Sequence, residues 1–329
     1  MPAPPPVQFA TPLPQSTRSD VLEWRFPKPY HNYVLTGRSR AAWHTSFIIP
    51  QLNLLLDAGL CVNRLRPKHI FLTHGHSDHT LLAPAFGFRD DPPDVYCPSE
   101  MAGVFEAFCH ARTMLNLGGL ITADDIDAST AATAADSDAI PTHTPIRPDI
   151  LATHLIHPVH PGSIVPLRRT KGLVTALAFA CDHSVPCLGY VFRHTTQKLK
   201  LEFSALPGTE LKRLSQSGVA LTEPVTKPVF AFLGDGTAKT LADGPEWLEE
   251  VKVVITECSF LFEEHRGQAD KTKHTIWGDL EPVVRRWPGV VFVLTHFSMR
   301  YSEEEVKGFF KGLGDPPGNI VVWADGEGG

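Results

Sequence analysis

The sequence lacks the features that mark membrane-spanning and disulfide-stabilised proteins. None of its apolar runs approaches the roughly 18 residues that a membrane helix needs, and the longest, such as residues 173–181, have the length of a strand. The six cysteines include no C-x-x-C pair, which favours reduced, buried thiols over a disulfide framework. No glycine-rich phosphate loop and no Ser-His-Asp order stand out. We therefore expect an intracellular protein, cytoplasmic or nuclear, that does not enter a membrane.

The chain also lacks an excess of basic residues, since 30 lysines and arginines stand against 36 aspartates and glutamates and the formal net charge is -6. A nucleic-acid partner needs lysine and arginine contacts to phosphates, so this value taken alone is unfavourable for one. However, five aspartates lie in an Ala/Asp/Ser/Thr-rich stretch, residues 123–139, that contains no basic residue, and leaving these five out reduces the net charge to -1. Net charge therefore does not exclude a nucleic-acid partner.

The composition along the chain predicts one main domain, residues 31–329, after a proline-rich leader without structure, residues 1–30. A low-complexity insertion at about 123–148 is expected to be solvated and mobile. A short arm-like segment is expected at about 191–228.

Short apolar runs bounded by glycine, proline or charge predict buried strands, and helical patterns lie between them. The strands are predicted at residues 52–56, 69–72, 175–180, 229–233, 251–256 and 290–294. The helices are predicted at residues 99–117, 245–250, 279–287 and 302–312. The pattern indicates a mixed α/β chain and is compatible with a sandwich of two sheets.

A potential metal ligand or acid–base group follows each predicted strand. Such groups collect at the carboxyl ends of strands in α/β folds, where several loops meet over a rigid platform. In chain order the groups are Asp57, Thr73-His74, Asp182-His183, Asp235, Glu257 and His296. Six coincidences of this kind predict that these loops share one site.

The strongest motif is a six-residue segment with four ligand-type side chains: His74, His76, Asp78 and His79. Imidazole and carboxylate are the usual ligands of zinc and similar divalent metals. The two alternate histidines can point to one ion and the adjacent Asp–His pair to another, so that two neighbouring ions share a water. Without a metal, packing four such groups together would carry the free-energy cost of burying polar side chains that lack a partner. The segment therefore predicts a metal pair.

The remaining ligands must come from other strand ends, and the candidates are His183, Asp235 and His296. Asp235 stands between Gly234 and Gly236, which permit a close approach, as expected of a carboxylate that bridges two ions. Each of these residues alone could be a turn aspartate or a structural histidine, but as a set they complete two coordination spheres.

The motif at residues 74–79 resembles the signature of the metallo-β-lactamase superfamily, and three later segments are similar to the short-form tRNase Z branch. They are His-Ser-Val-Pro-Cys-Leu-Gly-Tyr at 183–190, Thr-Glu-Cys-Ser-Phe at 256–260 and Leu-Thr-His-Phe-Ser-Met-Arg-Tyr at 294–301. The resemblance runs from about residue 35 to 314, outside the leader and the acidic insertion. It implies a four-layer αββα sandwich of two mixed sheets.

The resemblance also implies two zinc ions as cofactors. By analogy, one ion would be held by His74, His76 and His183. The other would be held by Asp78, His79 and His296. Asp235 would bridge the two ions, which would lower the pKa of a shared water to near neutrality and activate it for attack on a phosphodiester.

The same resemblance assigns acid–base roles. Asp78 would also accept a proton, His274 would protonate the leaving ribose oxygen, and Glu257 would orient His274. An ordinary surface ion pair is the alternative for Glu257 and His274. Asp57 would fix a ligand histidine from behind.

Many family members carry a long Gly/Pro-rich arm that grips the tRNA elbow, whereas here only 44 positions, residues 191–234, lie between the Gly-Tyr pair and Asp235. The segment resembles the shorter version of plant-type short forms, although a solvated hairpin is an equally good interpretation. The predicted phosphate contacts are Lys198, Lys200, Lys212, Arg213 and Arg300.

The leading functional prediction is a zinc phosphodiesterase that removes the 3′ trailer of precursor tRNA and leaves a 3′-hydroxyl. A homodimer is a possible assembly of this enzyme. The alternative keeps the fold and metals but takes a small ester, thioester, lactone or cyclic nucleotide. A non-catalytic binding subunit is a third class, and the complete set of seven ligands argues against it.

Three further histidines recur every three residues: His154, His157 and His160. Pro158 and Pro161 interrupt any helix there. We therefore expect a partly exposed loop rather than a third metal site.

Overall fold

The computed structural model describes residues 8–12, 21–62, 66–116, 151–168, 170 and 172–325, and every structural statement below concerns these residues. The insertion predicted at 123–148 lies outside them. No helix in these ranges is long and apolar enough to span a membrane.

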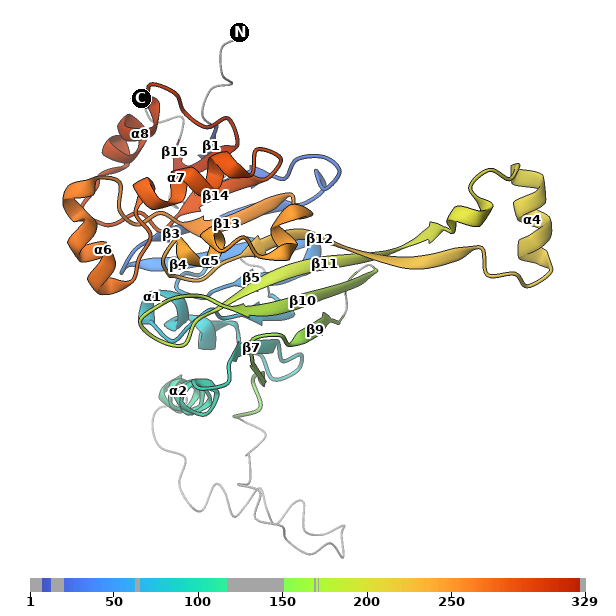
Figure 1. Cartoon of the computed structure of the whole chain (residues 1–329). Coiled ribbons are helices and arrows are strands. Elements are labelled where there is room, and N and C mark those ends of the chain that lie inside the picture. The colour runs from blue at the N-terminus through green and yellow to red at the C-terminus, as the bar shows by residue number, and fades with distance from the viewer. Residues whose placement is uncertain are drawn as a thin grey trace, which may run out of the picture.

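Two mixed β-sheets form the centre of the fold and are joined through one shared strand (Figure 1). The shared strand, β1 (Gln8–Pro12), pairs with a strand of each sheet. The N-terminal sheet contains β2 (Leu22–Arg25), β3 (Val34–Arg40), β4 (His44–Ile49), β5 (Leu54–Leu56), β6 (His69–Phe71), β7 (Asp94–Pro98) and β8 (Leu155–Val159). The C-terminal sheet contains β9 (Ile164–Leu167), β10 (Leu173–Ala180), β11 (Leu188–Leu199), β12 (Thr222–Phe232), β13 (Val253–Glu257), β14 (Val291–Thr295) and β15 (Ile320–Asp325).

Helices cover the outer faces of both sheets, and one further helix lies at the tip of the arm described below. The longer ones are α2 (Ala102–Asn116), α4 (Gly208–Gln216), α6 (Arg266–Thr272), α7 (Trp277–Arg286) and α8 (Glu303–Lys311). The short ones are α1 (Ser77–Thr80), α5 (Lys239–Ala242) and single 3-10 turns at Pro50–Leu52, Ala83–Phe86, Leu201–Phe203, Glu246–Glu249 and Glu263–His265. Apolar residues of α2 pack on the N-terminal sheet, whereas those of α5, α7 and α8 pack on the C-terminal sheet.

The central hydrophobic core lies between the two sheets and contains their largest side chains. Phe47 of the N-terminal sheet has its ring centroid 5.1 Å from that of Trp323 and 6.2 Å from that of Phe232, both in edge-to-face geometry. With one helix-covered core outside each sheet, the layers are helix, sheet, sheet and helix. The predicted αββα sandwich is confirmed.

All six predicted strands occur, with shifted ends. The first begins two residues late, at Leu54, because Pro50–Leu52 form a 3-10 turn before it. The fourth begins earlier, at Thr222, since β12 continues into the arm described below. The helix predicted at 245–250 is only the 3-10 turn Glu246–Glu249. The other three helices occur as α2, α7 and α8.

Two strands lie within the segment predicted to be a leader without structure, which corrects that prediction for residues 8–12 and 22–25. β1 runs parallel to β15 and antiparallel to β2, and Ala10 is completely buried. The pairing partner β15 is at the other end of the chain, so no local pattern reveals it. The rest of the predicted leader up to residue 20 lies outside the described residues.

A long arm projects from the body between β11 and β12 and carries α4 at its tip (Figure 1). The two strands stay paired over their whole length, from Tyr190–Phe232 in the body to Leu199–Thr222 near the tip. Their body ends are buried, and most of their outer residues are exposed. The segment predicted at 191–228 is therefore both arm-like and a hairpin.

Truncation of Phe47 should test the central core. Phe47→Ala removes a completely buried ring between the sheets and should lower the free energy of unfolding by about 3–5 kcal/mol, measured by guanidinium chloride denaturation. Leu201→Ala is the control, since this arm residue is 86% exposed and its loss should change the free energy by less than about 0.5 kcal/mol. Equal effects of the two substitutions would contradict the described core.

Candidate metal centre and catalytic site

The sheets bring the predicted site residues to one edge of the sandwich. β5 and β6 run parallel, as do β12, β13 and β14, so within each sheet their carboxyl ends lie at the same edge. β10 is antiparallel to β11, which is antiparallel to β12, so β10 also ends at that edge. The loops that follow these strands carry the ligand-type side chains of both sheets.

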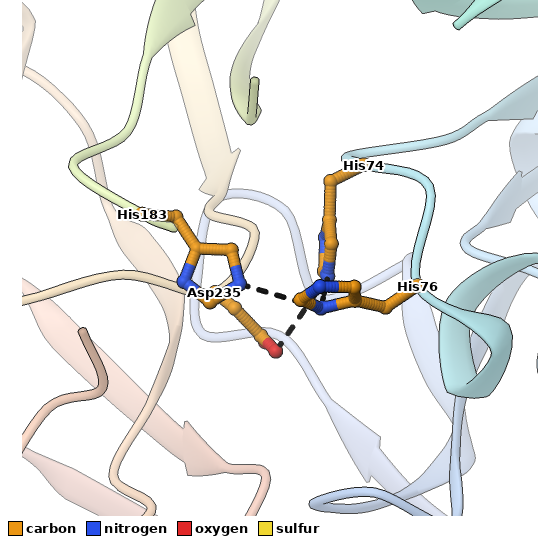
Figure 2. A group of neighbouring side chains, drawn as sticks. All are labelled: His74, His76, His183 and Asp235. Atoms are coloured by element: carbon orange, nitrogen blue, oxygen red, sulfur yellow. Dashed lines mark hydrogen bonds and ion pairs between the residues drawn. The ribbon is translucent and has the colours of Figure 1, made fainter. Parts of the chain in front are cut away.

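The first group consists of His74, His76, His183 and Asp235, whose candidate ligand atoms all lie within 4.8 Å of one another (Figure 2). His76 Nδ1 is 3.0 Å from His74 Nε2 and 3.4 Å from His183 Nε2. His74 Nε2 is 3.8 Å from Asp235 Oδ2. Three nitrogens and one carboxylate oxygen thus converge on one point.

The second group consists of Asp78, His79, His296 and the same Asp235. Asp235 Oδ2 is 3.3 Å from His79 Nε2 and 3.3 Å from His296 Nε2. Asp78 Oδ2 is 3.5 Å and 3.3 Å from the same two nitrogens. Because one oxygen of Asp235 faces both groups, this residue has the position of a bridging carboxylate.

Hydrogen bonds at the Nδ1 atoms of four histidines orient their rings toward the two groups. His183 Nδ1 donates to a backbone carbonyl, and His79 Nδ1 donates to a carboxylate, which leaves Nε2 of each ring facing its group. Such bonds fix the ring orientation and the tautomer of metal-ligating histidines. The partners are Thr73 Oγ1 for His74, Asp57 Oδ2 for His79, the carbonyl of Lys273 for His183 and Ser259 Oγ for His296, at 2.7–3.1 Å.

Asp57 has the supporting position that the sequence predicts for it. This completely buried carboxylate accepts bonds from the amide and hydroxyl of Thr73 as well as from His79. Burial raises its pKa, and the neighbouring His79 acts in the opposite direction.

The electrostatics favour positive charge between the carboxylates. Burial would lower the pKa of His79, but Asp235 and Asp57 raise it well above the ordinary value. Burial would likewise raise the pKa of Asp235, but His296 and His79 hold it well below its usual range. By contrast, burial lowers the pKa of His74, so its ring stays neutral, as a metal ligand must.

The residues present fit a pair of divalent cations. Each group offers four nitrogen or oxygen donors, the number that zinc takes in proteins, and one carboxylate is common to both. The Nε2 atoms of His79 and His296 are 3.3 Å apart beside two aspartates, an arrangement in which a shared cation satisfies all four groups.

An acid–base pair of a buried carboxylate and a half-buried histidine lies beside the two groups. His274 Nδ1 is 2.9 Å from Glu257 Oε1, and the His274 and His296 rings stack with centroids 5.5 Å apart. Glu257 is only 3% exposed, so the alternative of a surface ion pair is wrong. Burial would lower the pKa of His274, but the Glu257 carboxylate outweighs it and raises this pKa to about 9.

Glu257 is held by several donors besides His274. The amides of Gly236 and Thr275 and the hydroxyl of Ser259 donate to its two oxygens at 2.5–3.1 Å. The amide of Gly236 links this pair to the loop of Asp235, so the two parts of the site share one framework.

Backbone constraints also position the site. Asp57 and His296 have φ values of 54° and 61°, a left-handed conformation that is rare outside glycine and is often found at functional sites. A Cβ on Gly234 would lie 2.6 Å from the Cβ of Thr73, so only glycine lets the Asp235 loop approach the motif loop.

The predicted phosphate contacts lie in two places. Arg300 is beside the site, where its guanidinium lies 5.1 Å from the ring centroid of Phe260, and the Phe260 centroid is 6.5 Å from that of His274. The other four, Lys198, Lys200, Lys212 and Arg213, are all in the arm. Sequence reasoning missed the parts played by Ser259 and Lys273, although both adjoin predicted site residues.

Comparison with known proteins agrees with the resemblance seen in the sequence. The family model described as "Metallo-beta-lactamase superfamily" matches residues 54–113, which include the 74–79 motif. Over these residues the chain is similar to the metallo-β-lactamase superfamily.

Over most of its length, the chain is similar to proteins named for tRNase Z. It is 26% identical to a chloroplastic tRNase Z of Arabidopsis thaliana over 84% of this chain and 70% of that protein. It is 25% identical to a second tRNase Z of the same plant over 86% and 92%. A nuclear ribonuclease Z of Triticum aestivum is 27% identical over 59% of this chain and 94% of that protein.

Removal of the carboxylate behind His79 should weaken metal binding. Asp57→Asn keeps the size of the side chain but loses the charge that the His79 imidazole faces, so metal affinity should fall about 10–100-fold. Competition with a chromophoric chelator measures this. Glu23→Gln, in β2, serves as a control for the loss of one carboxylate. Unchanged affinity in Asp57→Asn would show that Asp57 does not support the metal centre.

Proposed function

We propose that the protein is a metal-dependent endoribonuclease of the tRNase Z type that removes the 3′ trailer of precursor tRNA, with two zinc ions as its cofactors. The observation that carries the proposal is the projecting basic arm attached to a two-centre site. The similarity to proteins named tRNase Z supports it.

The arm can bind a polyanion. Residues 191–228 contain six lysines and arginines and three glutamates, so the segment has a net charge of +3 in a chain whose net charge is -6. Arg213 bonds with Glu210, and Lys200 lies 3.8 Å from Glu202, whereas Lys198 and Lys212 are exposed. Lysine and arginine contacts to phosphates position a nucleic acid without reading its sequence.

The chain's own residues provide the acid–base chemistry. When bound, two divalent ions supply positive charge that stabilises the transition state of phosphodiester hydrolysis and acidifies water. His274, protonated at neutral pH because of Glu257, can donate its proton to the departing ribose oxygen. Asp78, an acceptor at the edge of the second group, is the proposed proton acceptor, and Arg300 is the proposed contact to a phosphate near His274.

A small-molecule hydrolase is the alternative, since metal ligands define a reaction type and not a substrate. An ester, thioester, lactone or cyclic nucleotide would use the same edge of the sandwich but would not contact the arm. The salt dependence of binding separates the two possibilities.

Cleavage of a 3′-extended precursor tRNA is the first test. The wild-type protein should cut it at the 3′ end of the tRNA, and His274→Ala should lower the rate about 100–10,000-fold, the usual contribution of a general acid. His76→Ala should also lower the rate, through loss of metal.

Metal content separates the two roles. His274→Ala should keep the wild-type amount of metal, whereas His76→Ala should lose part of it. If the intact, metal-loaded wild type leaves the precursor uncut but hydrolyses small esters, this result would contradict the tRNA proposal and favour the alternative.

The arm is tested by salt dependence. Replacing Lys198, Lys200 and Lys212 by glutamine should weaken precursor binding and reduce the slope of log affinity against log salt by about 2–3, roughly one unit for each lost phosphate contact. Filter binding at several salt concentrations measures this. A matched triple, Lys28→Gln, Lys252→Gln and Lys311→Gln, changes the net charge equally from exposed positions outside the arm and should leave the slope nearly unchanged.

An intracellular location remains part of the proposal. All six cysteines are free, as a reducing compartment would require. The relatives named above are described as chloroplastic in one case and nuclear in another, so they do not define one compartment for this chain. A homodimer is likewise proposed on the family resemblance alone, and sedimentation analysis tests it.

A further inference from the structure

The three histidines at 154, 157 and 160 do not form a loop. Residues 155–159 are the edge strand β8, paired in parallel with β7, so that expectation is wrong. His157 Nε2 is 2.7 Å from Asp94 Oδ1, and His160 Nδ1 is 3.0 Å from Ser99 Oγ. The three side chains thus have separate surroundings, and they do not bind one metal together.

His154 instead meets two residues of α2. Candidate ligand atoms of Glu106, His110 and His154 all lie within 4.8 Å of one another. Glu106 and His110 are four residues apart in the helix, a spacing that places both on one face, one turn apart. The rings of His110 and His154 have centroids 5.8 Å apart.

The group contains a buried nitrogen for which the described residues provide no hydrogen-bond partner. This atom, Nε2 of His110, is shielded from solvent. Buried polar atoms nearly always have a partner, whether protein, water or an ion, so one without a partner needs an explanation. The adjacent His154 is only 4% exposed, and its Nδ1 lies 3.0 Å from Thr153 Oγ1, a contact that holds the ring in place.

The group lies away from the catalytic edge. His74 follows the carboxyl end of β6, and β6, β7 and β8 are all parallel, whereas His154 precedes the amino end of β8. A five-residue strand covers about 17 Å at roughly 3.3 Å per residue. Helix α2 begins after the carboxyl end of β7 and packs against β8. His110, in the second half of α2, lies with His154 and thus near the amino end of β8.

We propose that Glu106, His110 and His154 form a further metal site that binds a divalent transition-metal ion such as zinc. Two imidazoles and one carboxylate are ligands of borderline metals rather than of Mg²⁺ or Ca²⁺, which prefer oxygen alone. Three protein ligands leave one tetrahedral position for water. The buried His110 nitrogen gains its missing partner when the ion binds.

This site has a structural consequence. His110 is in the second half of α2, and His154 immediately precedes β8, so the ion ties together the two chain segments that flank residues 117–150. An ion that binds only the folded state stabilises that state by mass action. Loss of the ion should loosen α2 from the edge strand without changing the catalytic loops.

Metal stoichiometry tests the site. Chelator-treated protein is titrated with Zn²⁺ against a chromophoric competitor, and bound zinc is counted by elemental analysis. The wild type should bind one equivalent more than Glu106→Gln or His110→Gln. His160→Gln is the matched control, because it removes a histidine that flanks the other end of the same strand and should keep the full stoichiometry.

Three further readouts keep the result interpretable. Both variants should keep the wild-type rate of hydrolysis, and zinc should raise the melting temperature of the wild type more than that of either variant. Cobalt substitution should show a visible absorption band in the wild type that both variants lose in part. In Asp235→Asn, which damages the catalytic centre, the further equivalent should remain.

The test measures a difference of one zinc equivalent between the wild type and each variant. This difference does not depend on the proposed catalytic metal pair or on the substrate. If the wild type, Glu106→Gln and His110→Gln bind equal amounts of zinc with equal affinity while folded, as circular dichroism shows, the site does not exist. Loss of all zinc in folded Glu106→Gln would also overturn the proposal, because the two sites would not be independent.

Discussion

The arrangement of the site depends on one buried carboxylate at the junction of the two sheets. Asp235 is 3% exposed, and its Oδ2 lies 3.3–3.8 Å from three histidines that come from both halves of the sandwich. A buried carboxylate is costly unless positive charge surrounds it. The loops of both sheets must therefore bring their imidazoles to this point, and the outer hydrogen bonds, the left-handed backbone at two residues and the close approach at Gly234 all serve that geometry.

The same constraint explains why most of the site could be predicted from the sequence. Ligand side chains occur where apolar strands end, and each such position is visible in a local pattern of a few residues. Residues 74–79, His183, Asp235, Glu257 and His296 meet in the structure for this reason. His274 lies between two helices, and only the family resemblance predicted it. Ser259 and Lys273 were not predicted as site residues. Ser259 contributes a hydroxyl and Lys273 a backbone carbonyl to histidines far away in the sequence, and no sequence spacing reveals such contacts.

The fold was predicted from local sequence patterns, and the errors occur where those patterns are missing or misleading. Apolar runs predicted six strands, but the starts of β5 and β12 depended on a 3-10 turn and on the arm, whose outer strand residues are exposed and carry no apolar pattern. β1 and β2 contain few residues and follow a proline-rich start, so composition favoured a leader. Likewise, Pro158 and Pro161 favoured a loop around the three histidines, whereas residues 155–159 form the edge strand β8, where proline is tolerated.

The pairing of β1 with β15 makes the order of synthesis matter. β1 joins both sheets, yet its parallel partner β15 lies far later in the sequence. During translation, β1 must wait for β15 to leave the ribosome before this pair can form, and until then the edge of β1 that faces β15 stays open. The joining of the two sheets is thus a late event, and a variant that cannot form the β1–β15 pair would expose unpaired strand edges to association with other chains.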